Sequence, residues 1–248
     1  MSKVLVTGGA KGVGAAIVRA LAAAGHDVAF TYRSSGEQAK ALAAEIMAAH
    51  PGRTIEALPL DLSDKAALDA FCEACEGETY FGFVHNAGQP YDALAAVMTQ
   101  DKAEAAMQVN FWAFTRLAKS LIRNMLRTRA GRIVAIGSVA ALRGNAGNAA
   151  YAASKGALIS YAKTLAIETG KRGIAVNVIA PGFVDTDMMA PYAAYREKME
   201  GQIPAGRFAR PEEVAGLAAF LMSEPAGYIS GTVLPIDGGL TAQLGVHR

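Results

Sequence analysis

Tyr151 and Lys155 stand four residues apart, and Ser138 lies thirteen residues before Tyr151. If residues 151–155 are helical, this spacing places both side chains on one helix face, one turn apart. A phenol has an ordinary pKa of ~10, and a neighbouring ammonium would favour the phenolate and draw that pKa down. A serine hydroxyl from another segment could then hold a substrate oxygen. The three residue types suit proton transfer at a carbonyl or alcohol, although Tyr-x-x-x-Lys alone also fits a half-buried ring beside a solvated amine.

The rest of the chain must position these groups, and its apolar pattern alternates between short runs and longer helical stretches. Several runs are continuously apolar, which is typical of strands covered on both faces. Their order predicts an α/β fold in a single domain, residues 1–248, with a Rossmann-type doubly wound parallel sheet of about seven strands and helices on both faces. The predicted strands are Lys3–Thr7, Asp27–Tyr32, Thr54–Pro59, Phe81–His85, Arg132–Gly137, Ile174–Ala180 and Thr232–Ile236.

The composition limits the classes of function. A net charge of +2 gives no reason to expect a nucleic acid or an anionic membrane as a partner. No apolar stretch approaches the ~20 residues of a membrane span, and the N-terminus shows no signal-peptide pattern, so we expect a cytoplasmic protein. Cys72 and Cys75 form a lone C-x-x-C in an acidic helical segment, which we interpret as two reduced thiols rather than a redox pair or half a metal site. No metal is expected.

A glycine-rich turn follows the first predicted strand, with the sequence Thr-Gly-Gly-Ala-Lys-Gly-Val-Gly at residues 7–14. Glycines permit a tight turn and a close approach of the backbone to a pyrophosphate, which then lies at the positive end of the next helix. The Gly-Lys-Ser/Thr ending of a Walker phosphate loop is missing. The turn therefore predicts a dinucleotide site at Gly8, Lys11, Gly12, Val13 and Gly14.

The end of the second predicted strand indicates which dinucleotide binds. An NAD site usually offers a carboxylate there for the ribose hydroxyls, whereas this chain has Arg33, Ser34 and Ser35. Arg33 can hold a 2′-phosphate through charge-assisted hydrogen bonds, and Lys11 adds a second cation. Arg33 could also be a solvated surface residue, but two cations at these places favour NADP(H).

Together these patterns resemble the short-chain dehydrogenase/reductase family over essentially the whole chain. Besides the residues above, the resemblance rests on Asp61-Leu62, Asn86-Ala87-Gly88, Asn110 and Pro181-Gly182. Segments 131–155, 173–188 and 203–231 look most like the 3-oxoacyl-acyl-carrier-protein reductases of that family. The family commonly has a second asparagine where this chain has His85, which we interpret as a buried histidine at a strand end.

The resemblance implies roles for these residues. Tyr151 would be the general acid, Lys155 would lower its pKa and bind the nicotinamide ribose, and Ser138 would hydrogen-bond the substrate carbonyl. Asn110 would hold a water that returns protons through Lys155; without the resemblance it reads as a helix-bending polar residue. Asp61, Asn86 and Thr186 could also be mere turn or cap residues. The implied cofactor contacts beyond the glycine turn are Arg33, Ser34, Asp61, Leu62, Asn86, Ala87, Gly88, Tyr151, Lys155, Pro181, Gly182, Val184 and Thr186.

The activity implied by the resemblance is the NADPH-dependent reduction of a 3-oxoacyl thioester, carried by an acyl carrier protein, as in fatty acid biosynthesis. Two alternatives stay open: an NADP-dependent dehydrogenase of a small alcohol, sugar or steroid, and a non-catalytic NADP-binding scaffold. The intact set of Ser138, Tyr151 and Lys155 argues against the scaffold. Acyl chain length, the choice between carrier protein and coenzyme A, and the pathway are not indicated by the sequence.

Arginines are dense in residues 116–143, and a carrier protein is acidic, so a basic patch beside the site would favour its docking. By resemblance, Arg129 and Arg172 would supply that patch, although cations near helix ends also complement the helix dipole.

Two further expectations concern larger segments. An apolar helix face that packs between subunits is suggested by Phe111, Trp112, Phe114 and Leu117. The family implies a homotetramer, or else a homodimer. The tail, residues 240–248, could cover a neighbouring subunit. Residues 185–210 lie between a strand end and a helix. We expect them to form a mobile lid over the active site, with an irregular surface loop as the alternative.

Overall fold

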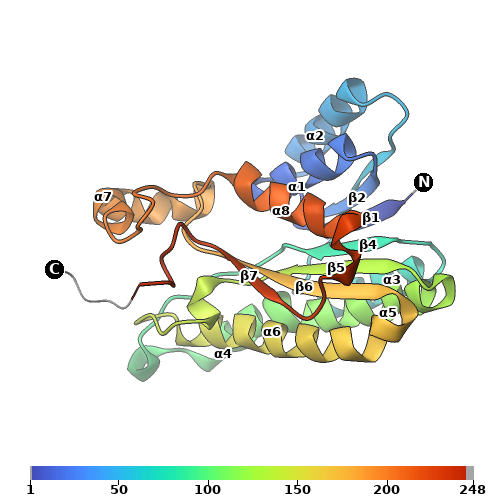
Figure 1. Ribbon diagram of the computed structural model, residues 1–248. Helices are drawn as coiled ribbons and strands as arrows, with labels where there is room; N and C mark the ends of the chain where they lie inside the picture. Colours follow the sequence, from blue (N-terminus) through green and yellow to red (C-terminus); the bar gives the residue numbers. More distant parts are fainter. Residues whose placement is uncertain (1, 244–248) are drawn as a thin grey trace.

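The centre of the molecule is one parallel β-sheet of seven strands, seen in the computed structural model, which describes residues 2–243 (Figure 1). The strand order is β3-β2-β1-β4-β5-β6-β7, and all neighbouring strands are parallel. The predicted α/β fold is confirmed, and no strand end differs from its prediction by more than one residue. The strands are β1 (Lys3–Thr7), β2 (Asp27–Tyr32), β3 (Ile55–Pro59), β4 (Gly82–His85), β5 (Gly131–Ile136), β6 (Ile174–Pro181) and β7 (Val233–Ile236).

Helices cover both faces of this sheet (Figure 1). One face carries α1 (Gly12–Ala23), α2 (Gly36–Ala49) and α8 (Pro211–Met222). The other face carries α3 (Lys65–Glu76), α4 (Gln100–Met107), α5 (Ala113–Thr128) and α6 (Ala149–Thr169), with a π-helical segment, η2 (Gln108–Trp112), between α4 and α5. The shorter helices are η1 (Ala95–Val97), η3 (Val139–Ala141), η4 (Gly170–Arg172), η5 (Asp187–Tyr195), α7 (Arg196–Glu200) and η6 (Pro225–Tyr228).

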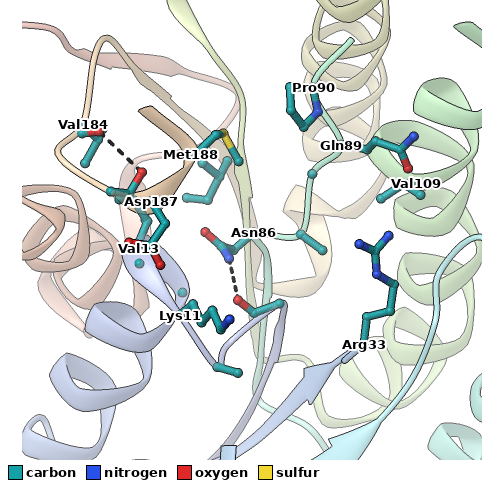
Figure 2. A pocket seen from close by; sticks show the side chains of 18 of the residues that line it. Lys11, Val13, Arg33, Asn86, Gln89, Pro90, Val109, Val184, Asp187 and Met188 are labelled. Carbon is teal, nitrogen blue, oxygen red and sulfur yellow. Dashed lines mark hydrogen bonds between the residues drawn. The ribbon is translucent and has the colours of Figure 1, made fainter. Parts of the chain in front are cut away.

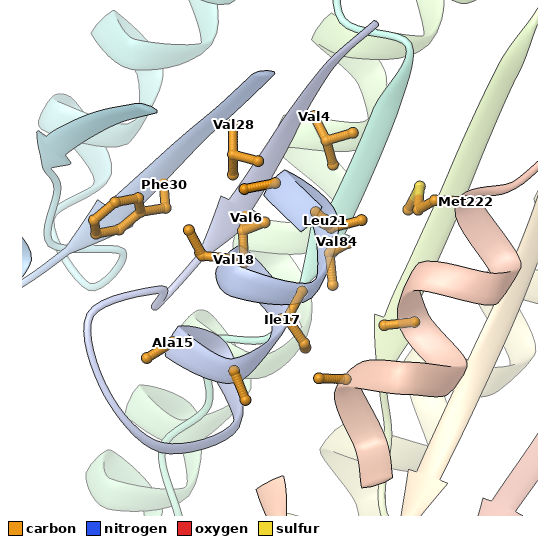
Figure 3. Packing of buried hydrophobic residues seen from close by; sticks show 14 of the residues in the cluster. Val4, Val6, Ala15, Ile17, Val18, Leu21, Val28, Phe30, Val84 and Met222 are labelled. Carbon is orange, nitrogen blue, oxygen red and sulfur yellow. The ribbon is translucent and has the colours of Figure 1, made fainter. Parts of the chain in front are cut away.

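The two helical layers explain why the strands are continuously apolar. Val4 and Val6 of β1 pack under α1, whereas Leu5 between them belongs to the core on the opposite face (Figure 3), because successive strand side chains alternate. Ile17 and Leu21 of α1 are completely buried over this sheet. Each such side chain contributes roughly 1.5–3 kcal/mol when it leaves water. The cores therefore hold the strand ends, and the loops that follow them, in fixed places.

Cys72 and Cys75 lie on α3, which confirms the predicted helix, and both are free thiols. Burial raises the pKa of both thiols, that of Cys75 to about 12, so neither is a reactive thiolate near neutral pH. Within residues 2–243, no group of three or more His, Cys, Asp or Glu side chains could hold a metal ion. Among the same residues, none of the helices has the length and apolarity needed to span a bilayer. Residues 244–248 of the C-terminal tail lie outside the described residues.

Candidate active site

A cleft of about 790 Å³ opens beyond the carboxyl ends of the strands (Figure 2). The strand order reverses between β1 and β4 at this edge, and ligands of open parallel sheets bind at such a reversal. Ser138, Tyr151, Lys155 and every residue predicted to contact the cofactor line the cleft. Three predicted site residues lie outside its lining, namely Asn110, Arg129 and Arg172.

The glycine turn forms one wall of the cleft and leads directly into α1. Gly12 has a φ of 52°, in the left-handed region that favours glycine. A Cβ added at Gly14 would lie 2.0 Å from the carbonyl oxygen of Gly8, so only glycine fits there. The first turn of α1 contains no acidic residue, and its N-cap makes no side-chain hydrogen bond. Its amide groups are therefore available to an anion such as a pyrophosphate.

Two exposed cations stand beside this wall. Lys11 lies in the glycine turn, and Arg33 extends from the end of β2 into the cleft (Figure 2). Neither side chain forms an ion pair with another residue in the range 2–243. Asp61 also faces the cleft, but its Oδ1 accepts hydrogen bonds from the backbone and hydroxyl of Ser63, which lower the pKa of the carboxyl. The arrangement suits a phosphate group near Arg33 and Lys11.

The opposite wall consists of Asn86, Ala87 and Gly88, which follow β4. Thr7 Oγ1 accepts hydrogen bonds from the amides of Asn86 and Ala87, each at 3.1 Å. Asn86 Nδ2 donates to the carbonyls of Thr7 and Gly8, at 3.2 and 3.0 Å. These bonds join the wall to the glycine turn, so Asn86 does more than complete a local turn.

Tyr151 and Lys155 lie in the first two turns of α6, which confirms the predicted helical pair. Lys155 is only 2% exposed, and its Nζ donates to the carbonyl of Ile136, at the end of β5, over 2.7 Å. The same ammonium lies 5.9 Å from the centre of the Tyr151 ring. Ser138 follows β5 and accepts the amide hydrogen of Ala140, at 3.1 Å, which leaves its own hydroxyl hydrogen to donate toward Tyr151 and the cleft.

The electrostatics of this pair correct one expectation. Burial raises the pKa of Tyr151; the nearby Ser138 hydroxyl opposes the rise, and the Asp92 carboxylate adds to it. Burial also lowers the pKa of Lys155 to about 8. The expected lowering of the Tyr151 pKa by Lys155 is therefore wrong in this structure. Loss of solvent at the phenol dominates, and Lys155, whose ammonium is directed at the Ile136 carbonyl, is not among the groups that shift the Tyr151 pKa.

Asn110 is completely buried in the π-helical segment η2. Its Oδ1 accepts the amide hydrogen of Gln89 at 2.7 Å, and its Nδ2 donates to the Gln89 carbonyl at 3.1 Å and to Ser154 Oγ at 2.9 Å. A Cβ on Gly88 would lie 3.4 Å from Lys155 Nζ and 3.5 Å from Asn110 Oδ1, so the structure brings these residues together. Asn110 fixes the loop beyond Gly88, a role that the sequence did not reveal. Its part in returning protons stays a prediction.

The segment 185–210 is more ordered than an irregular loop. It contains η5 and α7, and an isolated parallel bridge joins Val184 to Ala209. Arg196 forms two hydrogen bonds with Asp185, at 2.8 and 2.9 Å. Within η5, the Tyr192 hydroxyl donates to Asp92, in the loop beyond the Asn86–Gly88 wall. Thr186 and three residues of η5 line the cleft, the latter being Asp187, Met188 and Met189.

Arg129 and Arg172 do not border the cleft of their own protomer. Arg129 follows α5 and precedes β5, and Arg172 ends η4 just before β6. Both therefore lie at the amino ends of the strands, the edge opposite the cleft. Two other arginines of the dense segment, Arg116 and Arg123, form ion pairs with Asp69 and Glu76 of α3. The expected basic patch beside the site mouth is wrong for a single protomer.

The predicted apolar face between subunits is also partly wrong. Phe114 and Leu117 are fully buried in the core of their own protomer. Trp112 is 50% exposed, and its ring packs against Phe111. Only the η2 part of that face is available to another molecule.

Several residues of the cleft were not predicted. Gln89, Pro90 and Val109 line it, and Asp92 lies close enough to affect Tyr151. Gln89 and Pro90 directly follow Asn86-Ala87-Gly88, so their position in the chain could have identified them. Nothing in the sequence places Asp92 near the phenol.

Comparison with known proteins decides the family. A family model described as "Enoyl-(Acyl carrier protein) reductase" matches residues 8–241. A 3-oxoacyl-[acyl-carrier-protein] reductase, FabG, of Salmonella typhimurium is 39% identical over 95% of this chain and 96% of its own. The chain belongs to the short-chain dehydrogenase/reductase family.

Other family members show the range of this fold. The 3-oxoacyl-[acyl-carrier-protein] reductase MabA of Mycobacterium tuberculosis is 40% identical over 96% of this chain and 92% of its own. Among solved structures, a protein described as an NAD(P)-dependent gluconate 5-dehydrogenase, from Beutenbergia cavernae with bound NADP, has a TM-score of 0.92 and 36% identity over 98% of this chain and 97% of that one. A short-chain dehydrogenase/reductase from Serratia marcescens has a TM-score of 0.89 and 34% identity, covering 97% and 98% of the two chains.

Proposed function

We propose that this protein reduces a 3-oxoacyl thioester, attached to an acyl carrier protein, to the 3-hydroxyacyl thioester with NADPH. The observation that carries the proposal is the meeting of Ser138, Tyr151 and Lys155 beside a dinucleotide-shaped cleft. The carrier-protein reductases that match at 39–40% identity over nearly the whole chain support the substrate class.

The cleft fits NADPH at each point where a contact is needed. Gly12 and Gly14 leave room for the pyrophosphate at the start of α1. Arg33 and Lys11 would hold the 2′-phosphate. Asn86, Ala87 and Gly88 would lie against the nucleoside, and Lys155 keeps N–H groups free for ribose hydroxyls, because the carbonyl of Ile136 takes only one. NADPH supplies the hydride.

The protein side chains supply the proton and hold the carbonyl. Tyr151 donates its phenolic proton to the carbonyl oxygen as the carbonyl carbon receives hydride, so the ketone becomes an alcohol. Ser138 donates its hydroxyl hydrogen to the same oxygen and fixes its position. The raised pKa of Tyr151 suits an acid that must stay protonated until the transfer.

A second candidate is the oxidation of a sugar acid or another small alcohol with NADP. The protein described as an NAD(P)-dependent gluconate 5-dehydrogenase supports this candidate, because its structure matches nearly the whole of this chain with a TM-score of 0.92. Purified protein should be assayed with NADPH and acetoacetyl thioesters of carrier protein and of coenzyme A, with a 2-enoyl thioester, and with NADP and gluconate. Turnover of the carrier-linked ketone with a kcat/KM well above the rest supports the proposal. Turnover of gluconate alone, or of the 2-enoyl thioester alone, would replace it.

Residues 185–210 act, in this proposal, as a lid over the acyl chain. Met188 and Met189 present flexible apolar side chains to the cleft. The ion pair of Arg196 with Asp185 joins the two residues that flank the stretch from Thr186 to Tyr195, and the bond from Tyr192 to Asp92 holds η5 itself. Opening of the η5 part of the lid would then break the contact between Tyr192 and Asp92.

Carrier docking by Arg129 and Arg172 requires a second protomer, because both lie at the sheet edge opposite their own cleft. We propose a homotetramer, or at least a homodimer, in which these arginines stand beside the cleft of a neighbour. The half-exposed Trp112 supports such packing. Size-exclusion chromatography with light scattering measures the oligomeric state. A monomer would exclude docking by these two arginines.

A further inference from the structure

His85 is a fully buried histidine at the end of β4, directly before the Asn86–Gly88 wall. Its ring packs against Phe83 and Phe114, with centroid separations of 6.0 and 5.4 Å. Nδ1 lies 3.1 Å from Thr7 Oγ1. Nε2 is buried and has no hydrogen-bond partner among residues 2–243. A buried polar atom of this kind calls for an explanation.

The hydrogen bonds of Thr7 fix which ring nitrogen carries the proton. A hydroxyl has one hydrogen and two lone pairs. The amides of Asn86 and Ala87 both donate to Thr7 Oγ1, so its lone pairs are occupied. The hydroxyl hydrogen must therefore point at His85 Nδ1, which accepts it. A neutral ring that accepts at Nδ1 carries its own hydrogen on Nε2.

The surroundings of Nε2 lie in the turn that carries Asn110. The backbone of Val109 and Asn110, in the π-helical segment η2, lies near the His85 ring and favours its charged form, although neither residue is within hydrogen-bond geometry of Nε2. Burial, and the nearby charge of Lys155, lower the pKa of His85 to about 3, so the ring is neutral near pH 7. A backbone group that favours the charged form of a histidine is an acceptor, so η2 presents acceptors near the ring to which an Nε2–H group is matched in character.

We propose that His85, fixed by Thr7 as the Nε2–H tautomer, is a positioning residue that couples the cofactor wall to the turn carrying Asn110. On the wall side, His85 orients the Thr7 hydroxyl, which in turn holds Asn86 and Ala87. On the turn side, it faces the backbone of the residue whose side chain holds Gln89. The link would set the wall and η2 at one fixed separation, with Gly88 and Lys155 between them. The proposal holds for any substrate of the cleft.

The first test measures the tautomer itself. The ring nitrogens of histidine-labelled protein are observed by solid-state 15N NMR, with His85→Gln protein to assign the His85 signals. We expect a protonated Nε2 and an unprotonated Nδ1 at pH 7. A protonated Nδ1, in a neutral or a cationic ring, would overturn the proposal. The result is independent of turnover, so a failure of the proposed function leaves it intact.

The second test separates the two sides of the link with near-isosteric variants. In His85→Asn, the amide oxygen can replace Nδ1 as acceptor for Thr7, but the side chain is too short to reach η2. In His85→Gln, the amide nitrogen can replace Nε2, but the acceptor for Thr7 is lost. We expect His85→Asn to keep the Kd for NADPH within about twofold and to lower kcat, and His85→Gln to raise that Kd about tenfold, the effect of one buried hydrogen bond.

Thr7 provides the matched control. Thr7→Val removes the hydroxyl with little change in shape and should raise the Kd for NADPH about tenfold, as His85→Gln does. Thr7→Ser keeps the hydroxyl and should restore the wild-type Kd. A purely structural role predicts that the four variants lose kcat and affinity together, in proportion to their loss of thermal stability. That pattern, or four variants indistinguishable from wild type, would refute the positioning role.

Discussion

Replacing Lys155 by methionine should abolish turnover and yet make the folded protein more stable at pH 7. The side chain is 2% exposed, and burial lowers its pKa from 10.5 to about 8. Within residues 2–243, no carboxylate is ion-paired with it; its ammonium donates to a backbone carbonyl instead. Methionine fills nearly the same space without a charge. The buried ammonium therefore lowers the stability of the fold, and its use lies in the active site alone.

The size of the effect follows from the pKa. A fall of roughly 2.5 units at ~1.4 kcal/mol per unit corresponds to about 3 kcal/mol of unfavourable burial at pH 7. Methionine also leaves the Ile136 carbonyl without its donor, which costs ~1–3 kcal/mol. The difference predicts a gain of about 1 kcal/mol for Lys155→Met in the free energy of unfolding.

The sign of this gain should change with pH. The unfolded chain keeps its lysine proton up to a pH of ~10.4, whereas the native protein releases the Lys155 proton near pH 8. Between these values the unfolded state binds more protons, so the wild-type protein gains stability as the pH rises. Integrated from pH 7 to pH 9.5, this proton difference raises the free energy of unfolding of the wild type by about 2 kcal/mol relative to that of the variant. The variant should therefore be the less stable protein at pH 9.5, by about 1 kcal/mol.

Urea unfolding at matched protein concentration, at pH 7 and pH 9.5, measures the difference. Lys163→Met is the control, because Lys163 lies on the same helix and is exposed. Its stability relative to wild type should not change between the two pH values. If the difference for Lys155→Met is equally independent of pH, the assignment of a buried, pKa-lowered ammonium to this position is incorrect.

Four further substitutions, one of them with a control variant, test the rest of the site. Tyr151→Phe should lower kcat by about 10³-fold or more, because the proton donor is lost, while fluorescence titration gives an unchanged Kd for NADPH; substantial residual turnover would remove Tyr151 as the acid. Arg33→Ala should raise the Kd for NADPH by about tenfold or more and leave that for NADH nearly unchanged; equal losses would exclude the 2′-phosphate contact. Tyr192→Phe should increase hydrogen exchange in residues 187–195 and raise KM, because it removes the bond to Asp92. Tyr195→Phe is its control, since the exposed Tyr195 hydroxyl bonds no described side chain, and matching behaviour of the two would argue against a latch. Arg172→Glu should raise KM for a carrier-linked ketone but not for the coenzyme A thioester, and an equal effect on both would exclude carrier docking.

The fold and most of the cleft could be predicted because they follow from local patterns. Strands covered on both faces are continuously apolar, so their positions are visible in the sequence. A parallel sheet places all carboxyl ends at one edge, and residues that follow strands, such as Arg33, Asn86 and Ser138, therefore meet there. The same reasoning should have excluded Arg129 from its own cleft, because it precedes a predicted strand.

What could not be predicted depends on burial and on helix register. The π-helical segment η2 contains an extra residue per turn and so changes which residues of α5 face the core. The predicted subunit face of Phe111, Trp112, Phe114 and Leu117 misplaces the last two, which are buried. The pKa of Tyr151 likewise depends on how much water surrounds the ring, which the spacing to Lys155 does not reveal.

The functional side chains are held mainly by backbone groups at the strand ends. Lys155 bonds the carbonyl of Ile136, Asn86 bonds that of Gly8, and Asn110 bonds both backbone groups of Gln89. Side chains anchored in this way take their positions from the backbone and not from contacts with a substrate. The base of segment 185–210 is also fastened by backbone bonds, such as that from Asp185 N–H to the Ala209 carbonyl, whereas its η5 part is held by a contact between exposed side chains, Tyr192 and Asp92. The groups proposed to do the chemistry are thus anchored at the sheet edge, and we expect selection among ketones to come mainly from η5, whose Met188 and Met189 line the cleft.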